Sequence, residues 1–292
     1  MYCTLTRIAQ RAKCVGKVGA VRGVHNVAQV GFAKSAETYD SFRPSYPSEA
    51  VDHIMKECVT PVQKANDEVV VVDVGAGTGI FTRLLLEKDL SVAAIEPVEK
   101  MRQALEESIR GSRGKLRVME GGAEEIPLPS SSVDVVTCAQ AFHWFASHDS
   151  LKEFHRVLRP QRRLALVWNL EDRERGEKYS WVGDMRDFFE EFEGEGTPQF
   201  RKDEWRAAFL NQNYFEAIGE RRFLYEESLR KERLVERIMT RSYISRLEES
   251  EKNRVRTELR SILDQHNGAA DEEIVCPYFT LVSIWTRAEV GE

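Results

Sequence analysis

The stretch that most constrains the fold of this chain is VVVVDVGAGTG, at residues 69–79. Four consecutive valines, β-branched and apolar without alternation, are typical of a strand buried on both faces of a parallel sheet. Glycines follow at 75, 77 and 79, and glycine adopts positive φ angles and lets a ligand lie directly on the backbone. Residues 80–87 then favour a helix, whose N-terminus offers free N–H groups beside the sheet. The pattern predicts a ligand-binding crevice at the carboxyl edge of the sheet.

The rest of the chain alternates predicted strands and helices. After the first strand, further strands are expected at residues 91–96, 115–119, 133–138 and 163–168. Residues 171–265 are mostly helical, including a helix at 203–213, with one strand at 222–226, and residues 273–287 form a long final strand. Strands alternating with helices favour a doubly wound parallel sheet. The predicted fold class is α/β: a seven-stranded sheet, mostly parallel with an antiparallel C-terminal strand, and helices on both faces.

Composition narrows the classes of function. The 292 residues suit one large domain, and a hydrophobic content of 42% is enough for a substantial core. The net charge of -6 argues against nucleic acid held by bulk electrostatics, and no apolar run approaches the roughly 20 residues that cross a bilayer. The five cysteines never form CxxC, and His148 and His155 have no third ligand at metal-binding spacing. We expect neither a disulfide framework nor a metal site.

The N-terminus differs from the rest in charge. Residues 1–36 carry six basic side chains and no acidic one, with apolar residues at near-helical spacing. This is typical of a mitochondrial or plastid transit peptide, although a disordered tail without a targeting role, or a mispredicted start of the chain, would give the same composition. We expect a mitochondrial protein in the first case and a cytoplasmic one otherwise. The predicted organisation is an extension at 1–33 and a domain at 34–292, with its core at 65–170, a helical region at 171–265 and a closing strand at 273–287.

Two acidic residues bear on the ligand of the glycine turn. The dinucleotide fingerprint GxGxxG needs a glycine at position 80, where this chain has Ile80, so the turn argues against a nicotinamide cofactor. Asp73, just before the turn, suits a ligand that presents a cation or hydrogen-bond donors. Glu96 ends the next strand at the same edge, where a carboxylate can accept both hydroxyls of a ribose; the alternative is a solvated acid at a strand end.

These residues and three later motifs resemble the class I S-adenosylmethionine-dependent methyltransferases, in the small-molecule group with a methyltransferase type 11 core. The resemblance is carried by VVDVGAGTG, AAIEPVEKMRQAL, GGAEEIPLPSSSVDVVTCAQAFHWF and FHRVLRPQRRLALVWN, and spans about residues 38–169. YDSFRPSYP at 39–47 and SYI at 242–244 resemble the trans-aconitate-methyltransferase-like subgroup. The resemblance implies a Rossmann-like fold and S-adenosyl-L-methionine as cofactor.

The family pattern assigns roles to residues of this chain. It implies that Asp73 helps to hold the amino group of the cofactor, that Glu96 takes the ribose hydroxyls, and that Met101 covers one face of the adenine. The remaining implied cofactor contacts are the turn residues Gly75, Ala76, Gly77 and Gly79 against the methionine part, Ala123 and Glu124 at the adenine edge, the backbone carbonyl of Gln140 at the amino group, and a lid formed by Tyr39 and Arg43.

The acceptor side is less defined by sequence. A sulfonium methyl group is already activated, so the enzyme mainly needs proximity, alignment and exclusion of water, and a carboxylate acceptor needs no base. His143, in QAFHWF, follows the fourth strand and could be a general base, a hydrogen-bond donor to the substrate or a structural histidine. Trp144, Trp168 and Tyr243 could line the acceptor pocket, with core packing as an equal alternative.

One departure from related enzymes points to the acceptor class. The Asn/Asp-Pro-Pro-Tyr/Phe motif of enzymes that methylate amino groups of DNA bases or protein glutamine is absent, and QAFH begins at Gln140 instead. We therefore predict methyl transfer to a small molecule, at a carboxylate or hydroxyl oxygen, with no nucleic-acid partner. The competing hypotheses are a non-catalytic protein that kept the fold and, disfavoured by Ile80, a nicotinamide-dependent oxidoreductase.

Overall fold

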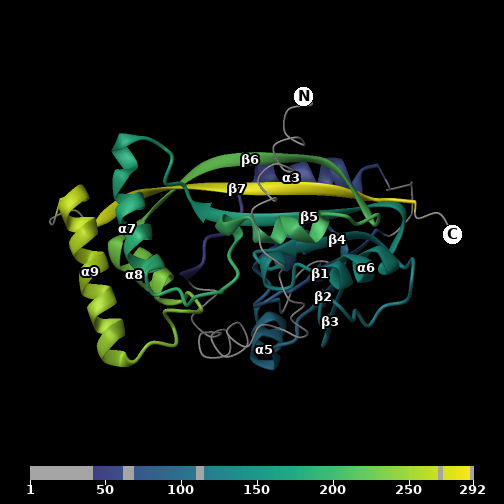
Figure 1. Ribbon diagram of the computed structural model, residues 1–292, viewed down its shortest axis with the longest axis horizontal. Helices are drawn as coiled ribbons and strands as arrows, with labels where there is room; N and C mark the ends of the chain where they lie inside the picture. The colour runs from purple at the N-terminus through teal and green to yellow at the C-terminus, as the bar shows by residue number, and fades with distance from the viewer. Residues whose placement is uncertain (1–41, 62–68, 110–114, 269–271, 290–292) are drawn as a thin grey trace.

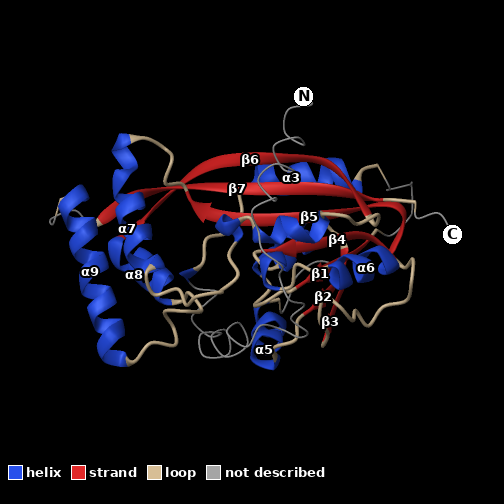
Figure 2. Cartoon of the chain, viewed as in Figure 1, coloured by secondary structure: helices blue, strands red, loops and turns tan. Residues whose placement is uncertain are grey.

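A single seven-stranded sheet in the order β3-β2-β1-β4-β5-β7-β6 organises the chain (Figures 1 and 2). The computed structural model describes residues 42–61, 69–109, 115–268 and 272–289, so the predictions for the basic N-terminus and for Tyr39 lie outside the described residues. The strands are β1 (Val70–Val74), β2 (Ser91–Ile95), β3 (Lys115–Met119), β4 (Val133–Ala139), β5 (Leu158–Glu171), β6 (Phe215–Arg230) and β7 (Glu273–Arg287).

Strand directions confirm the predicted fold class. Strands β1 to β5 pair in parallel, β7 pairs antiparallel with β5, and β6 pairs antiparallel with β7. The order reverses between β1 and β4, and ligands of open α/β sheets bind at such a switch point, outside the carboxyl ends of the strands. The glycine turn follows β1 at this point.

Three boundaries differ from the sequence-based prediction. Strand β5 spans fourteen residues rather than 163–168, and β6 spans sixteen rather than 222–226. Both gain their length from long antiparallel pairing with β7. The helix predicted at 203–213 is wrong in type and length, because the structure has a 3₁₀ helix, η6, at Glu204–Phe209.

Helices cover both faces of the sheet. One face carries α3 (Ser48–Ile54), the π-helical turn η2 (Met55–Val59), α4 (Ile80–Glu87) and α5 (Glu99–Ser108), which pack on apolar side chains of β1, β2 and β4. The other face carries α6 (His148–Val157), η6 and the short 3₁₀ helix η3 (Phe142–Trp144). A capping box between Ser147 and Ser150 begins α6.

A third core lies at one end of the long strands. Helices α7 (Ser180–Glu190), α8 (Lys231–Met239) and α9 (Glu249–Asn267) pack together on the ends of β6 and β7, at the left of Figure 1. We call these three helices the helical unit. Strands β6 and β7 join this unit to the sheet, because they extend from the sheet into the core of the three helices. None of the helices in the described ranges combines the length and apolar character that a membrane span requires.

Candidate functional site

The three glycines of the turn have left-handed backbones but different surroundings. Their φ angles are +72° at Gly75, +58° at Gly77 and +87° at Gly79. A Cβ atom at Gly75 would lie 2.7 Å from the Cβ of Ala141, and one at Gly79 would lie 2.9 Å from Cγ of Leu105. A Cβ at Gly77 would meet nothing within 4 Å. The outer two glycines therefore permit close packing, whereas Gly77 borders open space that a ligand can enter.

Neighbouring strands hold the turn in place. The N–H groups of Gly75 and Ala76 donate to the carbonyl of Ile95 on β2, at 2.8 and 3.1 Å. Glu96 follows directly, and its carboxylate accepts the N–H of Gly77 at 2.9 Å and the N–H of Val98 at 2.9 Å. Burial raises the pKa of Glu96, while these two N–H donors counteract that rise. The structure thus places Glu96 against the open glycine, as a ribose contact requires, and that contact stays a prediction.

Asp73 lies beneath the turn as a buried carboxylate. Its oxygens accept the hydroxyls of Thr82 at 2.7 Å and Thr137 at 2.9 Å, and its side chain is inaccessible to water. Burial raises the pKa of Asp73 to about 6, although both hydroxyls favour the ionised form. Among the described residues no cation contacts it. A positively charged ligand nearby would compensate this carboxylate, which fits the amino group and sulfonium of the expected cofactor.

The residues expected around the adenine are placed on two elements. Met101 is buried on α5, and Ala123 is buried in the loop after β3. Glu124 is exposed, and its carboxylate accepts the hydroxyl of Ser147 at 3.3 Å. Arg43 is half-buried and Tyr39 is outside the described residues, so the predicted lid stays a prediction.

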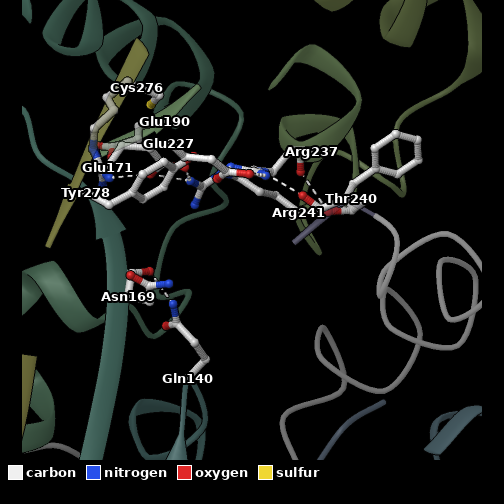
Figure 3. Close-up of polar contacts among 12 residues, drawn as sticks. Gln140, Asn169, Glu171, Glu190, Glu227, Arg237, Thr240, Arg241, Cys276 and Tyr278 are labelled. Atoms are coloured by element: carbon white, nitrogen blue, oxygen red, sulfur yellow. Dashed lines mark hydrogen bonds and ion pairs between the residues drawn. The ribbon is translucent and has the colours of Figure 1, made fainter. Parts of the chain in front are cut away.

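Gln140 directly follows β4, in a backbone conformation that residues other than glycine rarely adopt. Its φ is +55°, in the left-handed region, and its N–H donates to the carbonyl of Val167 at 2.8 Å. Its side-chain amide donates to the carbonyl of Asn169 on β5 (Figure 3). Backbone strain of this kind persists where surrounding contacts over-determine it, often at functional sites.

Asn169 is a buried residue that hydrogen-bonds to several elements, a role that the sequence did not reveal. Its Nδ2 donates to the carbonyl of Ser45 at 2.9 Å and to the hydroxyl of Tyr225 at 2.8 Å, while its Oδ1 accepts the hydroxyl of Thr280 at 3.0 Å. It therefore connects the segment before α3 with β6, β7 and Gln140. The signal was a polar residue directly after the apolar run of β5.

The structure brings together two candidates for the acceptor side. The indole N–H of Trp168 donates to Nδ1 of His143 at 3.1 Å. Trp168 is fully buried, and its ring lies 4.8 Å from that of Phe200 and 4.5 Å from that of Trp205. Burial lowers the pKa of His143 to about 3, so its imidazole is neutral at physiological pH. Trp144 is half-buried, with its ring 5.2 Å from the His143 ring.

Tyr243 lies in the core of the helical unit. Its side chain is buried among apolar residues of α7, α8 and α9, and this burial raises the pKa of its phenol. The structure thus places Tyr243 in a packed core, close enough to Arg241, Glu190 and Arg201 for their charges to act on its phenol. Its role as a pocket residue stays a prediction.

A chain of ion pairs that the sequence did not reveal joins β5 to the helical unit. Glu171, at the end of β5, accepts from Arg241 at 2.7 Å and from Arg186 at 2.9 Å (Figure 3). Both arginines outweigh burial and lower the pKa of Glu171 to about 2. The full chain, which we call the ion chain, alternates in charge from one cation to another: Arg241, Glu171, Arg186, Glu190, Arg201, Glu193 and Lys202.

Comparison with known proteins identifies the family. Residues 72–166 match the methyltransferase domain model. The chain is 30% identical over 253 residues to an uncharacterized methyltransferase of Mycobacterium tuberculosis, covering 86% of this chain and 93% of that protein. It is 30% identical over 232 residues to an uncharacterized methyltransferase-like protein of Schizosaccharomyces pombe, covering 79% of this chain and 85% of that protein.

A solved structure agrees in fold. A putative type II methyltransferase from Anaeromyxobacter dehalogenans superposes with a TM-score of 0.61 at 20% sequence identity, over 85% of this chain and 98% of that one. The glycine turn, Glu96 and the switch point lie within the matched domain. The chain belongs to the class I S-adenosylmethionine-dependent methyltransferases.

Proposed function

We propose that this enzyme methylates a carboxylate oxygen of a small-molecule acid. The observation that carries this proposal is the charge of the ion chain. Its seven side chains comprise four cations and three carboxylates, so one positive charge is uncompensated among the described members. An anionic acceptor would balance that charge, whereas a neutral or cationic one would not.

Arg241 is one end of the ion chain and pairs with Glu171, the last residue of β5. Its partner Glu171 follows Asn169 by two residues on β5, and Asn169 binds Gln140 (Figure 3). The Nε of Arg241 is buried and has no hydrogen-bond partner among the described residues. Such a donor gains free energy when a carboxylate accepts from it. The acid group of the acceptor would therefore bind beside Arg241.

The rest of the site has the properties that this reaction needs. S-adenosyl-L-methionine, when bound, supplies a methyl group already activated by a positively charged sulfur. Gly77 leaves room for a ligand, Glu96 borders that room, and Asp73 provides a buried negative charge. These residues bind and orient, and the buried aromatic side chains around Trp168 exclude water. A carboxylate acceptor then needs no proton removed.

The proposal is tested with labelled cofactor and a panel of small acids, phenols and amines. We expect methyl uptake by a small acid, as an ester, and a tenfold or larger rise in KM for that acid in Arg241→Gln. Binding of S-adenosylhomocysteine, measured by calorimetry, should not change. The matched control is Arg173→Gln, which removes a positive charge outside the ion chain, where Arg173 pairs with Asp187, and should leave KM unchanged. Uptake confined to phenols or amines would refute the acid assignment.

A further inference from the structure

The hydrogen bond between Trp168 and His143 fixes where the imidazole carries its proton. An indole N–H can only donate, so the nitrogen that faces it must present a lone pair. That nitrogen is Nδ1 of His143, 3.1 Å from Nε1 of Trp168. A neutral imidazole has one N–H, and it must therefore be at Nε2. Rotating the ring by half a turn would place a carbon against the indole, which cannot accept.

The two residues lie at the ligand edge, one on β5 and one on the short helix that follows β4. His143 lies on η3, three residues after Gln140, and Trp168 lies on β5 between the partners of Gln140 at Val167 and Asn169. The same segment contacts the cofactor turn, because the space in front of Gly75 is filled by Ala141 and Phe145. The orientation of His143 is thus set by β5, while its neighbours Ala141 and Phe145 contact the turn.

We propose that Trp168 is a positioning residue that holds His143 as a hydrogen-bond donor, through Nε2, to the methyl acceptor. This inference rests on the methyl transfer to a carboxylate proposed above. His143 then does not act as a general base. Its Nε2 already carries a proton, and its Nδ1 faces a donor that is fully buried and has no alternative partner among the described residues.

The proton balance of the reaction agrees with this role. When a carboxylate oxygen attacks the methyl carbon, an O–C bond forms, the C–S bond breaks, and its electron pair remains on sulfur. No proton is released, so no base is required. A donor at Nε2 can orient the carboxylate by binding one of its oxygens. A hydroxyl acceptor would instead release a proton that His143, held in this way, has no free lone pair to take.

Nuclear magnetic resonance of protein labelled with ¹⁵N in histidine tests the proposal without knowledge of the acceptor. Two-bond ¹H–¹⁵N correlations distinguish the two neutral tautomers, and the His143 signal is assigned by its loss in His143→Gln. We expect the Nε2–H tautomer in the full-length wild-type protein, with no titration between pH 5.5 and 8. An Nδ1–H tautomer, or a titration within that range, would overturn the proposal. Burial accounts for the low pKa of His143, and no charged neighbour among the described residues contributes.

A pair of tryptophan variants separates positioning from packing. Trp168→Phe keeps an aromatic ring but removes the N–H, so we expect mixed tautomers of His143 and a rise in its pKa. Trp205→Phe is the control, because Trp205 is equally buried in the same cluster and its indole nitrogen has no partner among the described residues. It should leave the His143 signals unchanged. If both variants shift the His143 signals alike, loosened packing of the aromatic cluster explains the effect, and Trp168 does not position His143.

The two proposals fail in different ways. Methyl uptake confined to phenols or amines would refute the proposed acid acceptor whatever the tautomer of His143. Methyl uptake by a small acid together with the Nδ1–H tautomer would refute the role of Trp168 alone. If Trp168→Phe does not fold, the wild-type spectrum still decides the question.

Discussion

At the scale of single residues, the three glycines of the turn have different roles: two permit close packing and one leaves room for a ligand. Gly75 and Gly79 have neighbours within 3 Å of the position of a Cβ, so side chains there would displace Ala141 and Leu105. Gly77 has no such neighbour, and its N–H is already held by Glu96. The middle glycine is therefore the position at which a substitution can affect a ligand without disturbing the protein core.

We predict that Gly77→Ala folds but binds S-adenosylhomocysteine at least tenfold more weakly, because the methyl group enters the space left for the ligand. The left-handed backbone costs about 1–2 kcal/mol of folding stability. Gly196→Ala is the matched control: its φ is +74° and a Cβ there meets nothing within 4 Å, but it lies outside the site. It should lose similar stability and no affinity. Calorimetry and thermal unfolding measure both, and unchanged affinity in Gly77→Ala would contradict the assignment.

A second residue-scale prediction concerns Asp73 and pH. Its pKa is about 6 in the folded protein and about 4 in the unfolded chain, so folding favours the protonated form. The stability this contributes is complete below pH 4 and is lost as pH rises through 6, by about 3 kcal/mol in all. Asp73→Asn should therefore raise the free energy of unfolding at pH 8 and change it little below pH 4.

The control for Asp73 is a buried carboxylate that does have cationic partners. Asp134 accepts from Arg159 at 2.6 Å and from Arg162 at 3.1 Å. Asp134→Asn should destabilise the protein at pH 8, the opposite direction to Asp73→Asn. If both substitutions destabilise the cofactor-free protein at that pH, then the ionised Asp73 is better compensated than its contacts indicate.

At the scale of elements, the sequence predicted those whose apolar residues follow a regular period. The buried strands β1, β2 and β4 and the helices of the helical unit were predicted, because their cores give continuous or helical spacing. Strand β6 was mostly missed, because residues 216–222 are all exposed and give no alternation. Its length comes from pairing with β7, which is a long-range contact that local sequence does not encode.

The ion chain gives the element-scale prediction. Glu171 has a pKa of about 2 when folded and about 4.3 when unfolded, so its ionisation stabilises the protein above pH 4.3, and this stability is lost as pH falls through 2. Glu171→Gln leaves Arg186 and Arg241 facing each other without their shared carboxylate. We expect a loss of about 3–5 kcal/mol in unfolding free energy at pH 7.

An exposed ion pair from α7 serves as the comparison. Asp187 binds Arg173 at 2.9 Å with both side chains largely exposed, so Asp187→Asn should cost under about 1 kcal/mol. Denaturant titration at pH 7 measures both variants. Equal losses of unfolding free energy in the two variants would mean that the ion chain stabilises the protein no more than an exposed ion pair does.

At the scale of the whole molecule, motif and topology predict different parts of the site. The glycine turn, Glu96 and Gln140 were predicted because they follow β1, β2 and β4, three neighbouring parallel strands that end at one edge of the sheet. Asn169, Glu171 and Arg241 were not, because each gains its role from partners on distant elements, such as Tyr225 on β6 for Asn169. Charged residues on the helical unit look like solvated helix faces in sequence, and only tertiary structure reveals which are buried.

Because β6 and β7 are shared by the helical unit and the sheet, we predict that the helical unit and the parallel strands unfold together. Strands β6 and β7 contribute to the core of the helical unit and also to the sheet, so neither part has a boundary where few contacts cross.

Leu259 is fully buried on α9, and Leu259→Ala should lower the free energy of unfolding by about 2–5 kcal/mol. In native-state hydrogen exchange, we expect the free energy of opening to fall by the same amount at the slowest-exchanging amides of α9 and of β1. Arg254→Ala, exposed on the same helix, should change neither. Faster exchange confined to α9 would show instead that the helical unit opens on its own, and that β5, β6 and β7 connect it to the catalytic sheet without making the two cooperative.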